Sequence, residues 1–233
     1  MTTAIKVIAF DLDDTLWDVR PVLIAAEKEL AAWLQHAVPG LRYDIDAVRA
    51  VRTDLLEARP ELGGMVTELR RSTIERLLMQ HGLPLSAASA LASDAMEIFL
   101  AARNRIDLFE GAHEALTILA PRFVLGVLTN GNADVHRLGL GHLFRFAFSA
   151  EDVGAPKPSP ALFEAALDRT KVLPGEMVYV GDDPHLDVDA ANRAGLRTIW
   201  VKSANKPEPG ETAADVTIEH VRHLPAAISR LEN

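Results

Sequence analysis

The feature that most constrains the fold is a change of hydrophobic pattern along the chain. After Gly111, short apolar runs rich in β-branched residues alternate with helical repeats, whereas residues 21 to 105 have helical periodicity throughout. Strands that alternate with helices predict a parallel, doubly wound sheet. One further apolar run, residues 5–10, precedes the helical part and is typical of a strand buried on both faces. We therefore expect an α/β fold with an all-helical insertion after the first strand.

The elements expected from these patterns define two domains. Four helices, separated by Pro and Gly residues, make up the insertion, at residues 23–34, 47–58, 66–82 and 86–103. The strands of the sheet are expected at residues 5–10, 123–128, 146–149, 177–180, 198–201 and 216–218. The predicted domains are thus a core, residues 1–17 and 106–233, and a helical cap domain, residues 18–105.

Composition excludes several classes of function. The 233 residues carry a net charge of −9, which argues against nucleic acid as a partner because a phosphate backbone requires a basic surface. The chain has no cysteine, which rules out disulfides and agrees with a reducing cytoplasm. No apolar segment approaches the length needed to cross a bilayer. We expect a cytoplasmic protein that binds neither nucleic acid nor membrane, as a monomer or homodimer.

Polar residues follow the ends of several predicted strands. Ligands of such sheets bind at the carboxyl ends of the strands, so these side chains are expected to meet at one edge. The set consists of carboxylates, a hydroxyl group, a turn with exposed amides and a lysine. Its members are Asp11, Asp13, Thr129, Asn130, Gly131, Lys157, Asp182 and Asp187.

These residue types together indicate phosphoryl transfer. Convergent carboxylates repel one another unless a cation neutralises them, and oxygen ligands favour Mg²⁺. Thr129, the amides that follow it and Lys157 would bind a phosphate group. Asp11 is nearest the strand end and is the expected nucleophile, forming an aspartyl phosphate that water then hydrolyses. Asp13 would protonate the leaving oxygen and later activate the water.

The segments DLDDT, LTN, KPSP and GDDPHLD, in this order, resemble the four motifs of the haloacid dehalogenase-like (HAD) phosphatases. The resemblance covers nearly the whole chain and implies a Rossmann-like core with a helical cap inserted after the first strand. It implies that Asp11 is the nucleophile, Asp13 the acid/base, and Thr129 and Lys157 phosphate ligands. It further implies a Mg²⁺ site formed by Asp11, the backbone carbonyl of Asp13, and Asp182, with Asp187 orienting the metal shell.

One subgroup is more similar still. FDLDDTLWDVRP, MVTELRRSTIE, the RID of residues 105–107 and LTNGNA resemble bacterial phosphatases that act on 5-amino-6-(5-phosphoribitylamino)uracil, a riboflavin precursor, and on FMN. In this interpretation Trp17 and Arg70 contact the substrate beyond its phosphate. Trp17 could instead pack at the hinge of the cap. For the predicted helix that contains Arg70, at residues 66–82, the ordinary alternative is ion pairing among Glu68, Arg71 and Glu75.

Other functions remain as alternatives. The substrate could be a sugar phosphate, a nucleotide or phosphoglycolate instead of a flavin-type phosphate. Carbon–halogen hydrolysis needs no acid for the leaving group, and dehalogenases of the family lack the second aspartate, so Asp13 argues against it. A mutase is a further alternative within the superfamily. A non-catalytic phosphate-binding or interaction domain is the alternative from another class, and such domains typically lose one of the residues that this chain retains.

Overall fold

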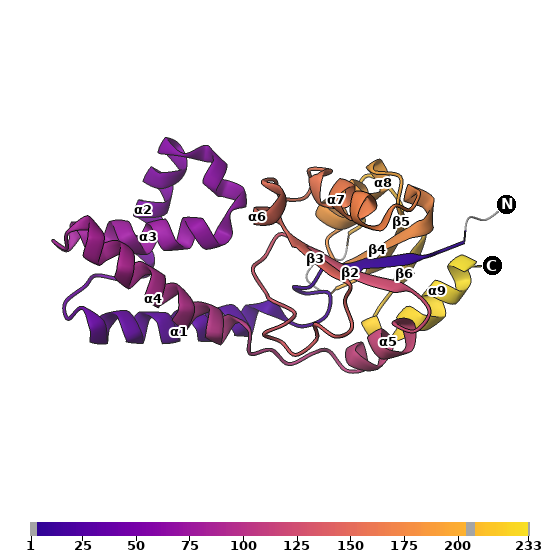
Figure 1. Cartoon of the computed structure of the whole chain (residues 1–233), viewed down its shortest axis with the longest axis horizontal. Coiled ribbons are helices and arrows are strands. Elements are labelled where there is room, and N and C mark those ends of the chain that lie inside the picture. The colour runs from indigo at the N-terminus through magenta and orange to yellow at the C-terminus, as the bar shows by residue number, and fades with distance from the viewer. Residues whose placement is uncertain (1–3, 204–207, 233) are drawn as a thin grey trace. The chain divides into compact units, whose positions relative to one another are not determined.

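The computed structural model describes residues 4–203 and 208–232 and divides the chain into two compact units. The first unit contains the residues up to Val19 and from Ile106 onward, and the second is Arg20–Arg105. We call them the core unit and the helical unit (Figure 1). The sequence predicts domain boundaries after residues 17 and 105. In the structure the two units divide after Val19 and after Arg105.

The core unit is built on a six-stranded sheet in the order β3-β2-β1-β4-β5-β6. Every pair of neighbouring strands is parallel. The strands are β1 (Val7–Phe10), β2 (Val124–Thr129), β3 (Phe146–Ser149), β4 (Met177–Gly181), β5 (Arg197–Val201) and β6 (Val216–Ile218). The predicted α/β class with a parallel sheet is therefore confirmed, and each strand lies within a residue or two of its expected position.

The first strand is central because its side chains are apolar on both faces. All four residues of β1 are buried, and Val7 is in register with Val124 of β2 and with Met177 of β4. A continuous apolar run suits a strand with a neighbour on each edge and helices on each face. After β1 the chain adds β2 and β3 on one side of this strand and then crosses to add β4, β5 and β6 on the other side. The carboxyl end of β1 therefore lies at the topological switch point.

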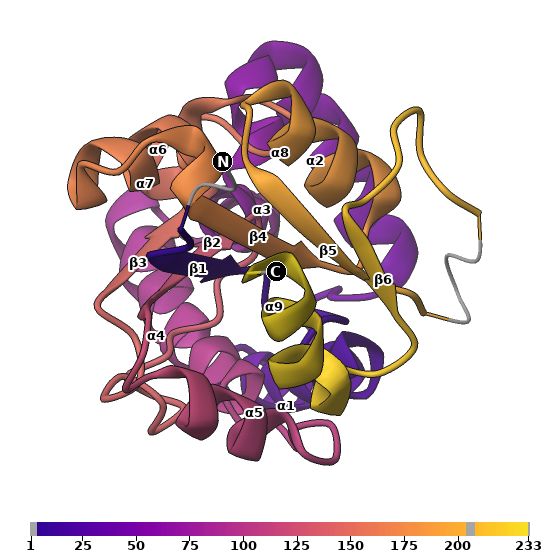
Figure 2. The same ribbon diagram turned by 90° about the vertical axis from the view of Figure 1, so that its right-hand side faces the viewer.

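Helices cover both faces of the sheet. Figure 2 shows α5 and α9 on one face and α7 and α8 on the other. The helices of the core unit are α5 (Ala112–Leu119), α6 (Ala150–Val153), α7 (Ala161–Thr170), α8 (Ala190–Arg193) and α9 (Leu224–Glu232). Short helical turns complete it, at η2 (Pro174–Glu176), η3 (Pro184–Asp189) and η4 (Val221–His223).

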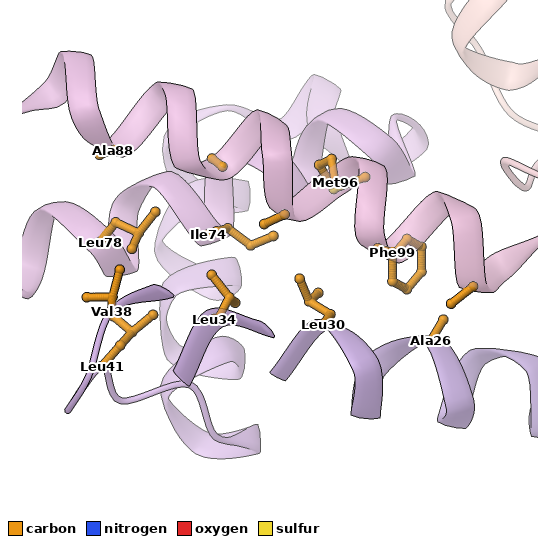
Figure 3. Packing of buried hydrophobic residues seen from close by; sticks show 13 residues of the cluster. Ala26, Leu30, Leu34, Val38, Leu41, Ile74, Leu78, Ala88, Met96 and Phe99 are labelled. Atoms are coloured by element: carbon orange, nitrogen blue, oxygen red, sulfur yellow. The ribbon is translucent and has the colours of Figure 1, made fainter. Parts of the chain in front are cut away.

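The inserted unit is entirely helical in its regular structure, as predicted. It contains α1 (Val19–Ala37), α2 (Ile45–Ala58), the turn η1 (Pro60–Gly64), α3 (Val66–Gln80) and α4 (Leu85–Arg103). Apolar side chains at helical spacing meet between α1, α3 and α4, among them Leu30, Ile74 and Phe99 (Figure 3). Burial of this shared face stabilises helices that would be marginal alone.

The expectation that no apolar segment approaches the length needed to cross a bilayer was wrong. Helix α4 is 19 residues long and apolar enough to cross a membrane by length and composition. Its buried residues, including Ala92, Met96 and Phe99, pack in the interior of the helical unit (Figure 3). Core helices of soluble proteins can meet the same two criteria, so length and composition alone do not make α4 a membrane span.

Candidate active site

A cavity of about 150 Å³ lies at the carboxyl ends of the central strands. Its lining brings together every predicted site residue of the core unit except Trp17. The lining residues are Asp11, Asp13, Asp14, Thr129, Asn130, Gly131, Lys157, Asp182, Asp183, Leu186 and Asp187. Parallel strands that end at one edge of the sheet thus place residues from four separate segments around one space.

Three buried carboxylates form the floor of this cavity. One oxygen each from Asp11, Asp182 and Asp187 lies within 4.8 Å of the others, and these side chains are almost fully buried. Carboxylates this close repel one another, and a hard divalent cation is the usual partner of such an oxygen set. The donor chemistry therefore fits Mg²⁺, with these three residues available to hold it.

Lys157 is the cationic residue among those that line the cavity. Its Nζ donates to Asp11 Oδ1, Asp187 Oδ1 and the Tyr179 hydroxyl, each at 2.7 Å. Burial alone would lower the pKa of Lys157, but the two carboxylates outweigh it and hold the pKa above its ordinary value. The ammonium therefore stays charged, and its three N–H groups hold it beside Asp11 and Asp187, where its charge can attract an anion.

The nucleophile candidate has a perturbed pKa. Burial raises the pKa of Asp11 to about 8, and the nearby charge of Asp187 adds to this, although Lys157 acts in the opposite direction. Burial thus opposes the charged form of Asp11 even beside the Lys157 ammonium. A divalent cation next to it would favour the carboxylate form that attack on phosphorus requires.

The turn after β2 is joined to the lysine loop. The Asn130 side chain accepts from the Lys157 amide at 2.7 Å and donates to the Lys157 carbonyl at 3.0 Å. The Gly131 amide donates to Thr129 Oγ1 at 3.0 Å. Asn130 therefore holds the two loops together through its side chain, while Thr129 faces the cavity and shapes the turn.

The residues after β1 divide as their spacing indicates. All three aspartates line the cavity, but the Asp14 carboxylate also accepts from the Val19 amide at 3.0 Å and supports the loop. Asp14 has a φ of 62°, a left-handed conformation that Asp tolerates better than most residues. Trp17 is fully buried and its indole Nε1 donates to Asp13 Oδ1 at 3.0 Å, so its contact here is with Asp13.

The loop after β4 is built closely around Asp187. A Cβ atom on Gly181 would lie 2.3 Å from Asp187 Oδ2, so glycine is required at this position. Asp187 Oδ2 accepts from the Asp183 amide at 2.9 Å. Asp187 therefore has protein partners on both oxygens, whereas the Asp182 Oδ1 atom has a long contact of 3.5 Å with the Thr15 hydroxyl.

Arg70 lies in the helical unit and is engaged there. Its guanidinium pairs with Glu27 and lies 3.8 Å from the centroid of the Phe99 ring. Its neighbour Arg71 pairs with Glu68 and Glu75 at 2.8 and 3.3 Å, as the helical spacing indicates. In this structure the described contacts of Arg70 are therefore internal to the helical unit.

The sequence analysis assigned no specific partners to two buried residues near the site, Tyr179 and Asp189. The Tyr179 hydroxyl accepts from Lys157 and donates to the Leu128 carbonyl at 2.8 Å. Asp189 accepts from the amides of Glu211 and Thr212, which tethers the loop after β5 to the loop after β4. A polar aromatic residue within an apolar strand, and an aspartate two positions after Asp187, were the available indications.

Comparison with known proteins identifies the relatives of this chain. A family model for haloacid dehalogenase-like hydrolases matches residues 5–195. The 5-amino-6-(5-phospho-D-ribitylamino)uracil phosphatase YigB of Escherichia coli K12 is 37% identical, over 97% of this chain and 93% of its own. The phosphoserine phosphatase of Thermus thermophilus is 29% identical, over 94% and 97%. The phosphatase names of these relatives confirm the predicted class, a phosphomonoester hydrolase.

A solved structure is also similar over almost the whole chain. A protein described as a 2-haloacid dehalogenase from Pseudomonas syringae pv. Tomato DC3000 superposes with a TM-score of 0.93 and 40% identity, covering 97% of this chain and 99% of that one. Its name differs from those of the phosphatases, but fold and family are the same. The match to the family model and the identity to these relatives show that the chain belongs to the haloacid dehalogenase-like hydrolases.

Proposed function

We propose that this protein is a Mg²⁺-dependent phosphomonoester hydrolase that works through an aspartyl phosphate on Asp11. The observation that carries the proposal is the meeting of three buried carboxylates with Lys157 in one cavity that Asp13 also lines. This combination supplies a nucleophile, an acid and a place for a phosphate group at the same edge of the sheet.

Each residue has a distinct role in the proposed reaction. An Asp11 oxygen attacks phosphorus while the bond to the leaving oxygen breaks, and Asp13 gives that oxygen a proton. Water then attacks the phosphoryl group on Asp11, and Asp13 takes a proton from the water. Lys157, Thr129 and the backbone amides of the turn at Asn130 and Gly131 bind the phosphate oxygens, for which the Gly131 amide exchanges its acceptor Thr129 Oγ1 for the phosphate.

Mg²⁺ would be held by Asp11, Asp182 and the Asp13 carbonyl, with Asp187 supporting this set. The metal, when bound, supplies positive charge against which the phosphate and Asp11 approach each other. The hydrogen bonds that Asp187 already accepts favour a supporting role, because direct coordination would have to share these oxygens.

We further propose that the substrate is a small phosphorylated metabolite of the flavin type. YigB, named for the phosphoribitylaminouracil, is 37% identical over nearly the whole of both chains, and this is what supports the choice. A place in riboflavin biosynthesis and a cytoplasmic location would follow. The relatives named for phosphoserine and for glyceraldehyde 3-phosphate keep other small phosphate esters as alternatives. The helical unit is the expected selector of the substrate, as a cap.

The dehalogenase name of the Pseudomonas syringae relative favours a second candidate, hydrolysis of a 2-haloacid. A halide leaves without a proton, so that reaction gives an acid such as Asp13 nothing to do. Asp13 in the cavity lining therefore supports the phosphatase over the dehalogenase.

A product-release panel tests these proposals. It compares phosphate release from FMN, the ribitylaminouracil phosphate, sugar phosphates, nucleotides and phosphoglycolate with halide release from 2-chloropropionate, with and without Mg²⁺. We expect Mg²⁺-dependent phosphate release, with the flavin-type esters highest in kcat/KM. Low kcat/KM for those esters refutes the substrate proposal alone, whereas halide release without phosphate release refutes the proposed activity.

A further inference from the structure

Trp17 is fully buried, and the hydrogen-bond partner of its indole nitrogen is Asp13. Its indole Nε1 donates to Oδ1 of Asp13 at 3.0 Å. A buried indole N–H normally needs an acceptor, but a carbonyl group would serve as well. Here the acceptor is the carboxylate proposed as the acid and base of the reaction, in a residue that lines the catalytic cavity.

The backbone around Trp17 fixes the position of its ring. The Asp14 amide donates to the Trp17 carbonyl at 2.8 Å and closes a tight loop. Trp17 also forms an isolated antiparallel bridge with Leu108, and the Phe109 amide donates to the Leu16 carbonyl at 2.8 Å. The two segments that connect the core unit to the helical unit are therefore paired with each other at Trp17, and the indole has little freedom to turn away.

This hydrogen bond makes the two oxygens of Asp13 unequal as sites for a proton. An oxygen that accepts the indole N–H at short range is a poor site for the acid proton, because the two hydrogens would compete for the same region. The proton of the acid form is thereby directed to Oδ2. That is the atom from which a leaving oxygen would take the proton, and to which the attacking water would return one.

We propose that Trp17 is a positioning residue for acid catalysis: its N–H binds Asp13 Oδ1 and presents Oδ2 to the leaving oxygen. The inference rests on the proposed phosphatase activity. In the first step the Asp11–phosphorus bond forms, the bond from phosphorus to the leaving oxygen breaks, and the Oδ2 proton moves to that oxygen. Trp17 itself exchanges neither proton nor electrons.

Dependence on the leaving group separates this role from a structural one. An alkoxide needs a proton as it leaves, whereas 4-nitrophenolate is stable enough to leave without one. Positioned acid catalysis contributes about 10²- to 10⁴-fold, and loss of positioning removes part of it. Trp17→Phe is therefore expected to lower kcat/KM for an alkyl phosphate roughly 10- to 100-fold, and for 4-nitrophenyl phosphate by less than about threefold.

The other two tryptophans provide matched controls. Trp200 Nε1 donates to the Asp182 carbonyl at 2.9 Å, so Trp200→Phe removes an indole N–H that does not bond to Asp13 and should affect both substrates alike. Trp33 packs in the helical unit, and Trp33→Phe should leave both substrates unchanged. Asp13→Asn serves as the reference for complete loss of the acid and should show the strongest dependence on the leaving group.

A second variant keeps the test informative if Trp17→Phe folds poorly. Site-specific replacement of Trp17 by benzothienylalanine keeps the bicyclic shape and removes only the N–H. Selective loss of alkyl phosphate hydrolysis in this variant supports the inference. Equal loss with both substrates, or no loss with either, overturns it. Absence of phosphate release by the unmodified protein from either ester instead overturns the proposed function, and the inference with it.

Discussion

Removal of a single hydroxyl group from Tyr179 should destabilise the core unit well beyond an ordinary surface change. This hydroxyl accepts from Lys157 Nζ at 2.7 Å and donates to the Leu128 carbonyl at 2.8 Å. Tyr179→Phe keeps the ring, which packs edge-to-face on Phe163 at a centroid distance of 5.0 Å. The variant therefore isolates the two hydrogen bonds from the packing.

The size of the effect follows from what is left unpaired. A buried donor or acceptor without its partner costs about 1–3 kcal/mol, and more when it is charged, as Lys157 is. Two such losses give an expected destabilisation of about 3 kcal/mol. For a chain of this length, that corresponds to a fall in Tm of roughly 6–12 °C. KM for a phosphate ester should rise too, because the Lys157 ammonium loses one of its three fixed partners.

Thermal unfolding followed by circular dichroism, with phosphate-release kinetics, measures both quantities. Tyr43→Phe is the matched control, because the Tyr43 hydroxyl has a longer contact of 3.3 Å with Glu27 in the helical unit. Its loss should stay below about 1 kcal/mol. A fall in Tm for Tyr179→Phe no larger than for this control would refute the role assigned to the buried hydroxyl.

Three further predictions concern the loop after β4 and the proposed nucleophile, Asp11. Burial alone would raise the pKa of Asp189, but hydrogen bonds from Thr212 and nearby amides lower it. Asp189→Asn should therefore cost about 2–3 kcal/mol at pH 7. This stabilisation is complete above the unfolded pKa of about 4 and is lost on acidification, so urea denaturation should show the two proteins converging toward low pH. Gly181→Ala should lower kcat/KM at least about tenfold by displacing Asp187, and activity equal to the unmodified protein would contradict the packing argument. With the pKa of Asp11 raised to about 8, Mg²⁺ binding at pH 7 should release close to one proton, and affinity should rise with pH until about 8. Calorimetry in buffers of different ionisation enthalpy measures this release, which Asp11→Asn should abolish.

The parts of the structure that follow from periodicity and strand order could be predicted from the sequence. The apolar run at β1, the alternation after Gly111 and the helical insertion led to the observed sheet. The convergence of Asp11, Thr129, Lys157 and Asp182 needed only the rule that parallel strands end at one edge. These inferences depend on the backbone and tolerate errors of a residue or two.

The partners of individual side chains could not be predicted in the same way. Trp17 was expected to contact the substrate or pack at the hinge. Its contact with Asp13 lies across a loop in which Asp14 is left-handed, and periodicity does not reveal such a loop. Tyr179 appeared as one more residue of a buried strand, because its hydroxyl partners come from other segments of the chain. Helix α4 satisfied the criteria for a membrane span because a helix with one face packed in a protein interior can share its length and composition with a spanning helix.

The central claim is that Asp11 becomes phosphorylated during turnover. The direct measurement is acid quenching of the protein with Mg²⁺ and 4-nitrophenyl phosphate, whose leaving group needs no proton, followed by mass spectrometry of the peptide that contains Asp11. We expect one phosphoryl group on Asp11, more of it in Asp13→Asn because that variant lacks the base that activates water, and none in Asp11→Asn. Turnover by Asp11→Asn at the rate of the unmodified protein would contradict the account.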